Sequence, residues 1–259
     1  MGDTLKIFGR TYPNTNGFKA EDEYGNVLMF TKGGITSIWQ DDDGAIVLND
    51  ENGNNEVDYL TLRAHNEKCS YTNNKITSLE TGYFIDGWTN LSQISLPNCI
   101  AFKKGFAMGA NGNDNLLAYF PKLQTMTGQS FQNFRCQVLA LPEITGVANY
   151  AFYSSKIPII DLGKNCASIG GTHSLDGNVS TLIIRYNSVC SLSATNSLPP
   201  ATFGSSGTGG TLYVPSSQIS AYQSATNWST ILGYTNNQIL PIEGSEYEHY
   251  YADGTEVTS

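Results

Sequence analysis

The side chains suited to chemistry are few in this 259-residue sequence and lie far apart. Its three histidines, His65, His173 and His249, are too widely separated to indicate a metal cluster or a catalytic triad. Glycoside hydrolysis would need two facing carboxylates about 5 to 10 Å apart. Six acidic residues lie between residues 78 and 214: Glu80, Asp86, Asp114, Glu143, Asp161 and Asp176.

Glu143 and Asp161 come closest to such a pair. They lie one repeat apart in the pattern described below, but their places within the repeat differ by three residues. We therefore expect no enzyme and no cofactor, with a polysaccharide depolymerase as a lesser alternative.

Two further patterns concern ion binding. Asp41-Asp42-Asp43-Gly44 places carboxylates before a glycine, but it lacks the twelve-residue spacing and closing glutamate of a calcium loop. We expect ordinary hairpin turns there, and calcium binding stays open. The glycine-rich segment 204–210 lacks the Gly-Lys-Ser/Thr ending of a phosphate loop and is interpreted as a flexible insertion.

The cysteine count is odd, so the thiols cannot all pair within one chain. The five are Cys69, Cys99, Cys136, Cys166 and Cys190. Three or four of them fall near inward places of the repeat, and we expect buried free thiols that pack as small apolar residues.

A short sequence motif recurs along residues 91–214 and predicts the secondary-structure elements that carry these side chains. It is a pair of apolar residues one position apart, usually closed by proline. The second apolar residue of each copy, here called the anchor, is Leu96, Phe120, Leu141, Leu162, Ile184 or Val214. The anchors follow one another at steps of 24, 21, 21, 22 and 30 residues, which is the period range of leucine-rich repeats.

Other apolar places recur with the anchors. Four or five residues before them stand Leu91, Leu116, Cys136, Ile157 and Val179, and six to eight after them stand Phe102, Met126, Val147, Ile169 and Leu192. A later aromatic place holds Phe106, Phe131 and Phe152, and His173 takes it in the fourth copy as a core or edge residue. One copy alone cannot bury its apolar side, so the pattern predicts one short strand per copy, stacked in parallel.

The repeats resemble those of the BspA-like leucine-rich repeat proteins, which carry the Leu-Pro phrase followed by an Ala-Phe such as Ala151-Phe152. The closing segment is similar to a terminal unit of repeat proteins from gut phages and bacteria, in its Leu212-Tyr213-Val214-Pro215-Ser216 and its stretch from Ala221 to Trp228. The resemblance covers about residues 75 to 243. The opening of the chain is similar to gut-phage structural proteins in Gly17-Phe18-Lys19-Ala20 and in the turn at Gly25-Asn26.

We therefore expect a mainly β protein, a leucine-rich-repeat solenoid whose parallel strand ladder has about six coils, preceded by a small N-terminal β-hairpin domain. Residues 217–228 are predicted to form a helix that covers the open end, with Ile219, Tyr222 and Ala225 inward and Ser216 or Ser217 as N-cap. The expected divisions are an anchor unit at 1–33, a polar connector at 34–58, a cap at 59–90, the solenoid at 91–243 and a polar tail at 244–259, either loosely held or reaching a neighbouring subunit.

Composition restricts the function classes. The net charge is −9, and no concentrated basic patch is visible, so we expect no nucleic-acid partner. No stretch approaches the roughly 20 apolar residues of a membrane helix, so we expect no membrane insertion. The N-terminus lacks the features of a signal peptide, which favours a product made in the cytoplasm.

The outward residues of the predicted strands form an apolar surface. Stacking would bring together Leu117, Tyr119, Val138, Ile159 and Ile183, with Asp161 beside them. A surface of this kind is seldom left bare. We expect these six residues to bind a partner, most simply another copy in a homo-oligomer such as a trimer, or else a receptor; coverage by the chain's own flanking segments stays open.

These expectations combine into a function. The chain is predicted to be a non-enzymatic phage virion protein, of the head or a tail fibre, assembled in the host cytoplasm. Its N-terminal unit would bind other virion proteins, and its repeats would be displayed for a protein or glycan of the host surface. The alternative is a BspA-like adhesin on the bacterial cell surface.

Overall fold

The computed structural model describes residues 4–7, 10–13, 18–21, 27–30, 37–40, 46–49, 55–57, 70–72, 76–79, 91, 93–103, 114–204 and 208–249. Up to residue 75 only the backbone of the strands is described. The described chain is mainly β, with short helical turns towards the C-terminus. Among these residues, no helix has both the length and the apolar character needed to cross a membrane.

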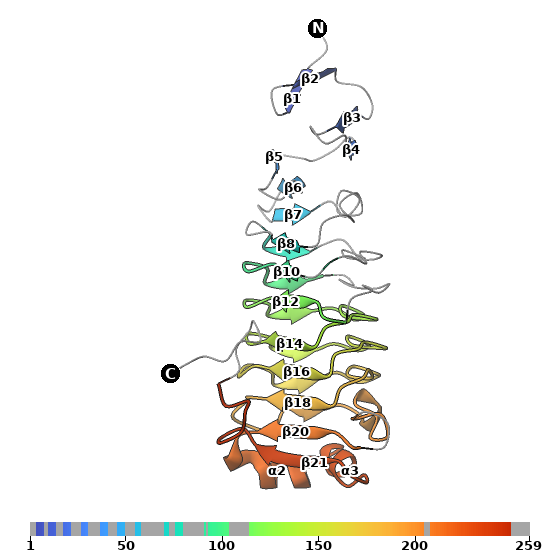
Figure 1. Ribbon diagram of the computed structural model, residues 1–259, viewed down its shortest axis with the longest axis vertical. Helices are drawn as coiled ribbons and strands as arrows, with labels where there is room; N and C mark the ends of the chain where they lie inside the picture. The colour runs from blue at the N-terminus through green and yellow to red at the C-terminus, as the bar shows by residue number, and fades with distance from the viewer. Residues whose placement is uncertain are drawn as a thin grey trace.

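The main strands lie one below another along the long axis of the molecule (Figure 1). They are β8 (Ser70–Thr72), β10 (Gln93–Ser95), β12 (Leu117–Tyr119), β14 (Val138–Leu141), β16 (Ile159–Leu162), β18 (Thr181–Ile184), β20 (Thr211–Val214) and β21 (Gln238–Pro241). They form two parallel sheets, in the orders β12-β10-β8 and β14-β16-β18-β20-β21. The predicted parallel pairing is confirmed within each sheet, but among the described residues β12 and β14 are not paired, so the predicted single ladder is divided there. All six anchors are fully buried.

The ladder is longer at both ends than the predicted span of 91–214. β8 pairs with β10 at one end, and β21 pairs with β20 at the other, where Pro241 lies opposite Val214. The pattern missed β21 because its anchor place holds proline in place of an aliphatic residue. The expected cap at 59–90 contains β8 and the whole of a shorter strand, Ser78–Leu79, and its remaining residues lie largely outside the described ones.

Each turn from β8 to β18 also contains a second short strand, so the prediction of one strand per copy was wrong. These strands are β9 (Ser78–Leu79), β11 (Ala101–Phe102), β13 (Thr125–Met126), β15 (Gly146–Val147), β17 (Ser168–Ile169) and β19 (Ser191–Leu192). They form the parallel sheets β13-β11-β9 and β15-β17-β19. The last residue of each is buried, so the recurring apolar places after the anchors do point inward, but from strands and not from irregular chain.

Aromatic rings fill the upper core. Phe131 and Phe152 stack with ring centroids 5.2 Å apart and ring planes 4° apart. The backbone N–H of Phe152 donates to the carbonyl of Ser174 in the next turn. The residue after Ser174, Leu175, is the side chain that is buried at the corresponding place in the core. His173, expected at this place, is half-exposed, because the chain between Leu162 and Leu175 has one extra residue before β17 and one after it, compared with the chain between Leu141 and Phe152.

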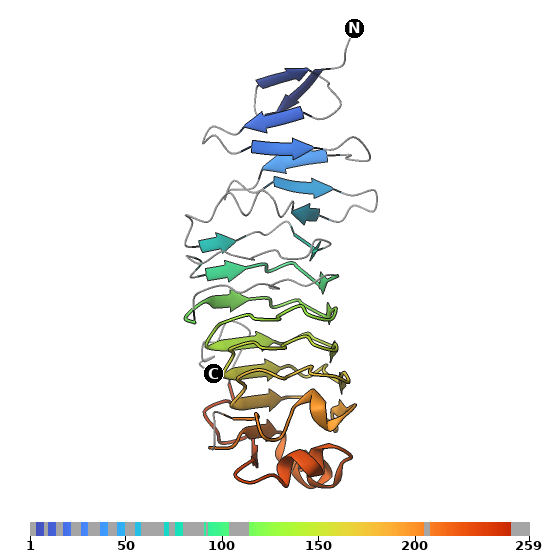
Figure 2. The ribbon, with the colours of Figure 1, turned by 90° about the vertical axis from the view of Figure 1, so that its right-hand side faces the viewer.

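The lower end of the column is closed by η2 (Ser216–Gln218), α2 (Ile219–Ser224) and α3 (Trp228–Leu232), as Figure 2 shows. A further 3-10 turn, η1 (Thr195–Ser197), precedes them. The predicted single helix over 217–228 was wrong. The chain becomes extended at Ala225, and Asn227 takes a left-handed φ of 66°.

This break lets two aromatic side chains bind the same backbone. Tyr222 accepts a hydrogen bond from the Cys190 N–H at 2.9 Å, and Trp228 donates its indole N–H to the Cys190 carbonyl at 2.7 Å. Both backbone groups would otherwise be unpaired at the end of the stack. The predicted serine N-cap is also wrong: Gln218 precedes α2 without a side-chain cap bond, and the Ser216 N–H donates to the Glu243 carboxylate at 2.9 Å.

The strands before residue 58 pair in antiparallel fashion. β1 (Thr4–Ile7) pairs with β2 (Arg10–Pro13), and β3 (Phe18–Glu21) pairs with β4 (Val27–Phe30). The segment expected to be a polar connector contains three strands in the order β5-β6-β7, namely β5 (Ser37–Gln40), β6 (Ile46–Asn49) and β7 (Asn55–Val57). The acidic and glycine-rich clusters between them lie outside the described residues.

Candidate partner-binding face

Two residues of each main strand alternate away from the core and form what we call the outer face. Within each sheet, parallel pairing without slippage aligns them in two rows, because each strand repeats the register of its neighbour. β12 lies beside β14, where the two sheets meet. One row of outward residues consists of Leu117, Val138, Ile159, Thr181 and Thr211. The other row consists of Tyr119, Ala140, Asp161, Ile183 and Tyr213. All six predicted partner-binding residues therefore lie on this face.

The lower part of the outer face is covered by the chain's own C-terminal segment, residues 242–249, which follows β21 and turns back beside the ladder (Figure 1). Ile242 and Tyr247 pack on Ile183, with Ile159 and Tyr213 at the border of this cluster. The rings of Tyr213 and Tyr247 meet edge to face, with centroids 4.8 Å apart. Burial in this contact is the main reason why the pKa of Tyr247 is raised to about 12.

A buried ion pair holds this segment in place. Arg185 of the loop after β18 reaches back to Asp161 of β16, where its Nε lies 3.0 and 2.9 Å from the two carboxylate oxygens. Its Nη2 lies 2.9 Å from Oδ2 of the same carboxylate. The guanidinium also donates to the carbonyl oxygens of Tyr247 at 2.7 Å and Glu248 at 3.3 Å. One side chain thus ties two adjacent turns of the column to the C-terminal segment.

Asp161 is almost fully buried, so burial and the contact with Arg185 act in opposite directions on the pKa of its carboxyl. Desolvation raises the pKa of its carboxyl above the usual value, and the hydrogen bonds and charge of Arg185 lower it by less. Because both carboxylate oxygens accept from Arg185, the geometry suits a structural ion pair and leaves no oxygen free to act as a nucleophile.

The upper part of the outer face is left uncovered by residues 242–249. Leu117 exposes 63% of its surface, and Tyr119, Val138 and Ile159 are half-buried. We call Leu117, Tyr119 and Val138 the uncovered strip, and Ile159 lies at the border of the covered part. Of the six predicted residues, the structure therefore places Asp161 and Ile183 under the chain's own segment, the alternative left open above, and leaves the uncovered strip accessible.

The remaining polar candidates that the structure describes each bond to a different partner and form no common site. Glu143 accepts a hydrogen bond from the Asn165 amide at 2.8 Å, while Asp161 is bound to Arg185. His173 lies 2.6 Å from Asp176. Within the part of the chain that the structure describes, no three histidine, cysteine or acidic side chains gather to hold a metal ion. The candidate calcium residues 41–43 lie outside that part.

The thiols behave as the sequence predicts. Cys99, Cys136, Cys166 and Cys190 are free and buried, and Cys69 lies outside the described residues. Burial raises the pKa of Cys99 to about 12, and contact with Cys166 together with burial raises the pKa of Cys190. These two thiols stay protonated near neutral pH and are poor nucleophiles.

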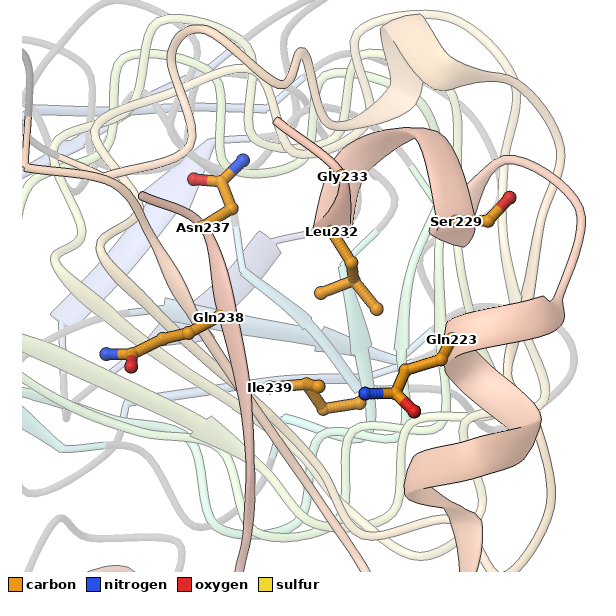
Figure 3. Close-up of a pocket in the computed structure, with 7 residues that line it drawn as sticks. All are labelled: Gln223, Ser229, Leu232, Gly233, Asn237, Gln238 and Ile239. Carbon is orange, nitrogen blue, oxygen red and sulfur yellow. The ribbon is translucent and has the colours of Figure 1, made fainter. Parts of the chain in front are cut away.

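An open pocket of about 500 Å³ lies between α2, α3 and β21. Its lining residues are Gln223, Ser229, Leu232, Gly233, Asn237, Gln238 and Ile239 (Figure 3). None of them is charged. The Asn237 amide is already bonded to the backbone of Gly210, Pro200 and Ile231, so it ties the end of the column together. The lining residues of the pocket include the hydroxyl of Ser229 but no acid or base that could activate it.

Sequence reasoning missed Arg185 as the partner of Asp161. It left coverage by the chain's own flanking segments open, but it did not identify residues 242–249 as the cover. Comparisons of the chain with protein-family models, with curated proteins and with solved structures give no match.

Proposed function

We propose that the chain is a non-enzymatic structural protein of a phage virion, of the head or a tail fibre. In this proposal the parallel column is a leucine-rich-repeat solenoid of the BspA-like type. The N-terminal β-hairpin unit attaches it to other virion proteins, and the column is displayed towards the host surface. The sequence features at Gly17 to Ala20 and from Leu212 to Trp228 support the phage origin through their resemblance to phage proteins.

The observation that carries the binding role is the uncovered strip on the outer face. A run of apolar side chains on neighbouring strands is a usual mark of a protein contact. Glu143 is bonded to Asn165 and Asp161 to Arg185, which favours a structural role for both carboxylates.

The virion assignment predicts that the chain purifies with particles. Its peptides should follow the major capsid protein at a constant ratio across the particle peak of a density gradient, measured by quantitative mass spectrometry. A variant that lacks residues 1–58 should keep its fold, because the described core begins at Ile76, but should be lost from the particles. The full-length chain with the same tag is the control.

Two results would contradict this assignment. Equal occupancy of the truncated and full-length chains on particles would show that residues 1–58 do not attach the chain to the particle. Peptides found only in the bacterial envelope fraction, and absent from particles, would favour the adhesin.

The uncovered strip predicts a homo-oligomer, with a trimer as the expected form. A Leu117→Asp, Val138→Asp double variant should be monomeric at a concentration where the wild type is oligomeric, because it places charges in an apolar contact. Light scattering measures the mass directly. Tyr234→Asp is the matched control, since Tyr234 is 48% exposed at the far end of the column. A monomeric wild type would contradict the prediction of a homo-oligomer formed through the uncovered strip.

A further inference from the structure

A cluster of exposed aromatic side chains lies on the return segments that follow β15 and β17, away from the outer face. It consists of Tyr150, Tyr153 and His173, and we call it the aromatic cluster. The tyrosines expose 39% and 36% of their surfaces. Ring centroids are 5.7 Å apart for the two tyrosines, and 5.4 and 5.5 Å from Tyr150 and Tyr153 to His173. Three rings in mutual contact make one continuous surface.

The fold does not require aromatic residues at these places. The preceding turn has the same backbone shape and carries Gln129 and Gln132 where this turn carries Tyr150 and Tyr153. Gln129 and Tyr150 share a left-handed φ, at 65° and 57°. The N–H of Gln132 donates to Gln129, just as that of Tyr153 donates to Tyr150. The two tyrosines are therefore additions to a turn that glutamine also builds.

The aromatic cluster is held rigidly by its neighbours. The backbone N–H of Tyr150 donates to the Thr172 carbonyl at 2.9 Å, and that of His173 donates to the Asn196 carbonyl at 3.0 Å. The Nδ1 of His173 donates to the Asp176 carboxylate at 2.6 Å, which leaves Nε2 for a ligand. A surface fixed in advance loses less conformational entropy when it binds.

The chemistry of the cluster indicates its ligand. Tyrosine offers an apolar ring face with a polar hydroxyl at its rim, and here a histidine nitrogen adds a second polar group. A pyranose with equatorial hydroxyls matches this arrangement, because its ring faces carry only C–H groups and its rim carries the hydroxyls. The carboxylate in contact with the cluster, that of Asp176, accepts a hydrogen bond from His173 and is therefore not free to bind a cationic ligand alone.

We propose that the aromatic cluster binds a neutral β-linked oligosaccharide of glucose or N-acetylglucosamine units. The inference deepens the proposed display of the column towards a host surface by naming the class of receptor, and in that sense rests on it. Sugar binding by the purified chain is nevertheless separable from that function. Sugar binding without incorporation into particles would support the sugar site and contradict the virion assignment. Incorporation without sugar binding would support the virion assignment and contradict the sugar site.

The test is saturation-transfer NMR on the full-length chain with cellotriose and chitotriose as probes. At least one of them should receive saturation, strongest at the axial C–H protons. A Tyr150→Gln, Tyr153→Gln double variant should fold normally, because it copies the preceding turn, and should bind at least about tenfold more weakly. Tyr234→Gln, which removes an equally exposed tyrosine elsewhere, should bind as the wild type does.

Three outcomes would overturn the proposal. The first is that neither trisaccharide receives saturation from the wild-type chain. The second is that the double variant, with an unchanged melting temperature, binds as tightly as the wild type. The third is a change of oligomeric mass in the double variant without sugar binding by the wild type, which would make the cluster a protein contact.

Discussion

Replacing Arg185 with methionine is expected to lower the free energy of unfolding by about 3 to 5 kcal/mol, because removal of one partner leaves the other charge buried and unpaired. The charge left behind is Asp161, which is 3% exposed. The variant also loses the hydrogen bonds to Tyr247 and Glu248 that hold the C-terminal segment on the outer face. Urea unfolding followed by tryptophan fluorescence measures the change.

The size of this loss should depend on pH, with a sign that follows from the pKa of Asp161. Burial already raises that pKa in the folded wild type, and Arg185 is what lowers it. Without Arg185 the folded-state pKa rises further, so the folded state binds the proton more strongly than the unfolded chain. Stability then falls as pH rises from the unfolded value, about 3.9, through the folded one. The defect should therefore be larger at pH 8 than at pH 5.

Asp161→Asn is the matched control for this ion pair. It leaves Arg185, which is partly exposed and keeps its two carbonyl partners, so its loss should be smaller than that of Arg185→Met. It also removes the titrating carboxyl, so its loss relative to the wild type should not grow between pH 5 and pH 8. A loss for Arg185→Met that is equal at the two pH values, or smaller than that for Asp161→Asn, would contradict the assignment of Asp161 as the uncompensated charge.

Leu141→Ala should lower the free energy of unfolding by about 2 to 5 kcal/mol, the range for a leucine in a packed core. Leu141 is fully buried at the middle of the column, and its strand β14 pairs with β16. The spread in the expected loss reflects how far neighbouring turns can close the cavity. Thermal and urea unfolding of the two proteins give the value directly.

The control for this change is Leu117→Ala, at an outward place of the next strand. Leu117 is 63% exposed, so its truncation should change stability by less than about 0.5 kcal/mol in the isolated subunit. Similar losses for both variants would mean that the inward and outward places have been exchanged.

The parallel ladder and its register were predictable from the sequence because they follow from a local pattern. A slip of one residue would turn Leu139 and Leu141 outward and Ala140 inward, so the spacing of the apolar pair selects one register. The near-constant step between anchors then aligns successive copies. The burial of all six anchors and the pairing of Leu141 with Leu162 agree with this reasoning.

The second strand of each turn was less accessible from sequence. A pair such as Ser168-Ile169 is too short to show alternation, and it becomes a strand only because Gly146-Val147 and Ser191-Leu192 lie beside it. The place of His173 was misjudged for a related reason. Two extra residues, one before β17 and one after it, move Leu175 into the core and His173 to the surface, beside Tyr150 and Tyr153.

What the sequence by itself determined was the set of inward residues, since burial of the anchors depends on neighbours at a fixed step along the chain. Only the tertiary structure decided which part of the outer face stays open. That depends on Tyr247 reaching Ile183 and on Arg185 joining Asp161 to a segment 62 residues further along. No local pattern relates residues so far apart, because their contact is selected by the three-dimensional fit of the last segment to a surface that exists only after the column has formed.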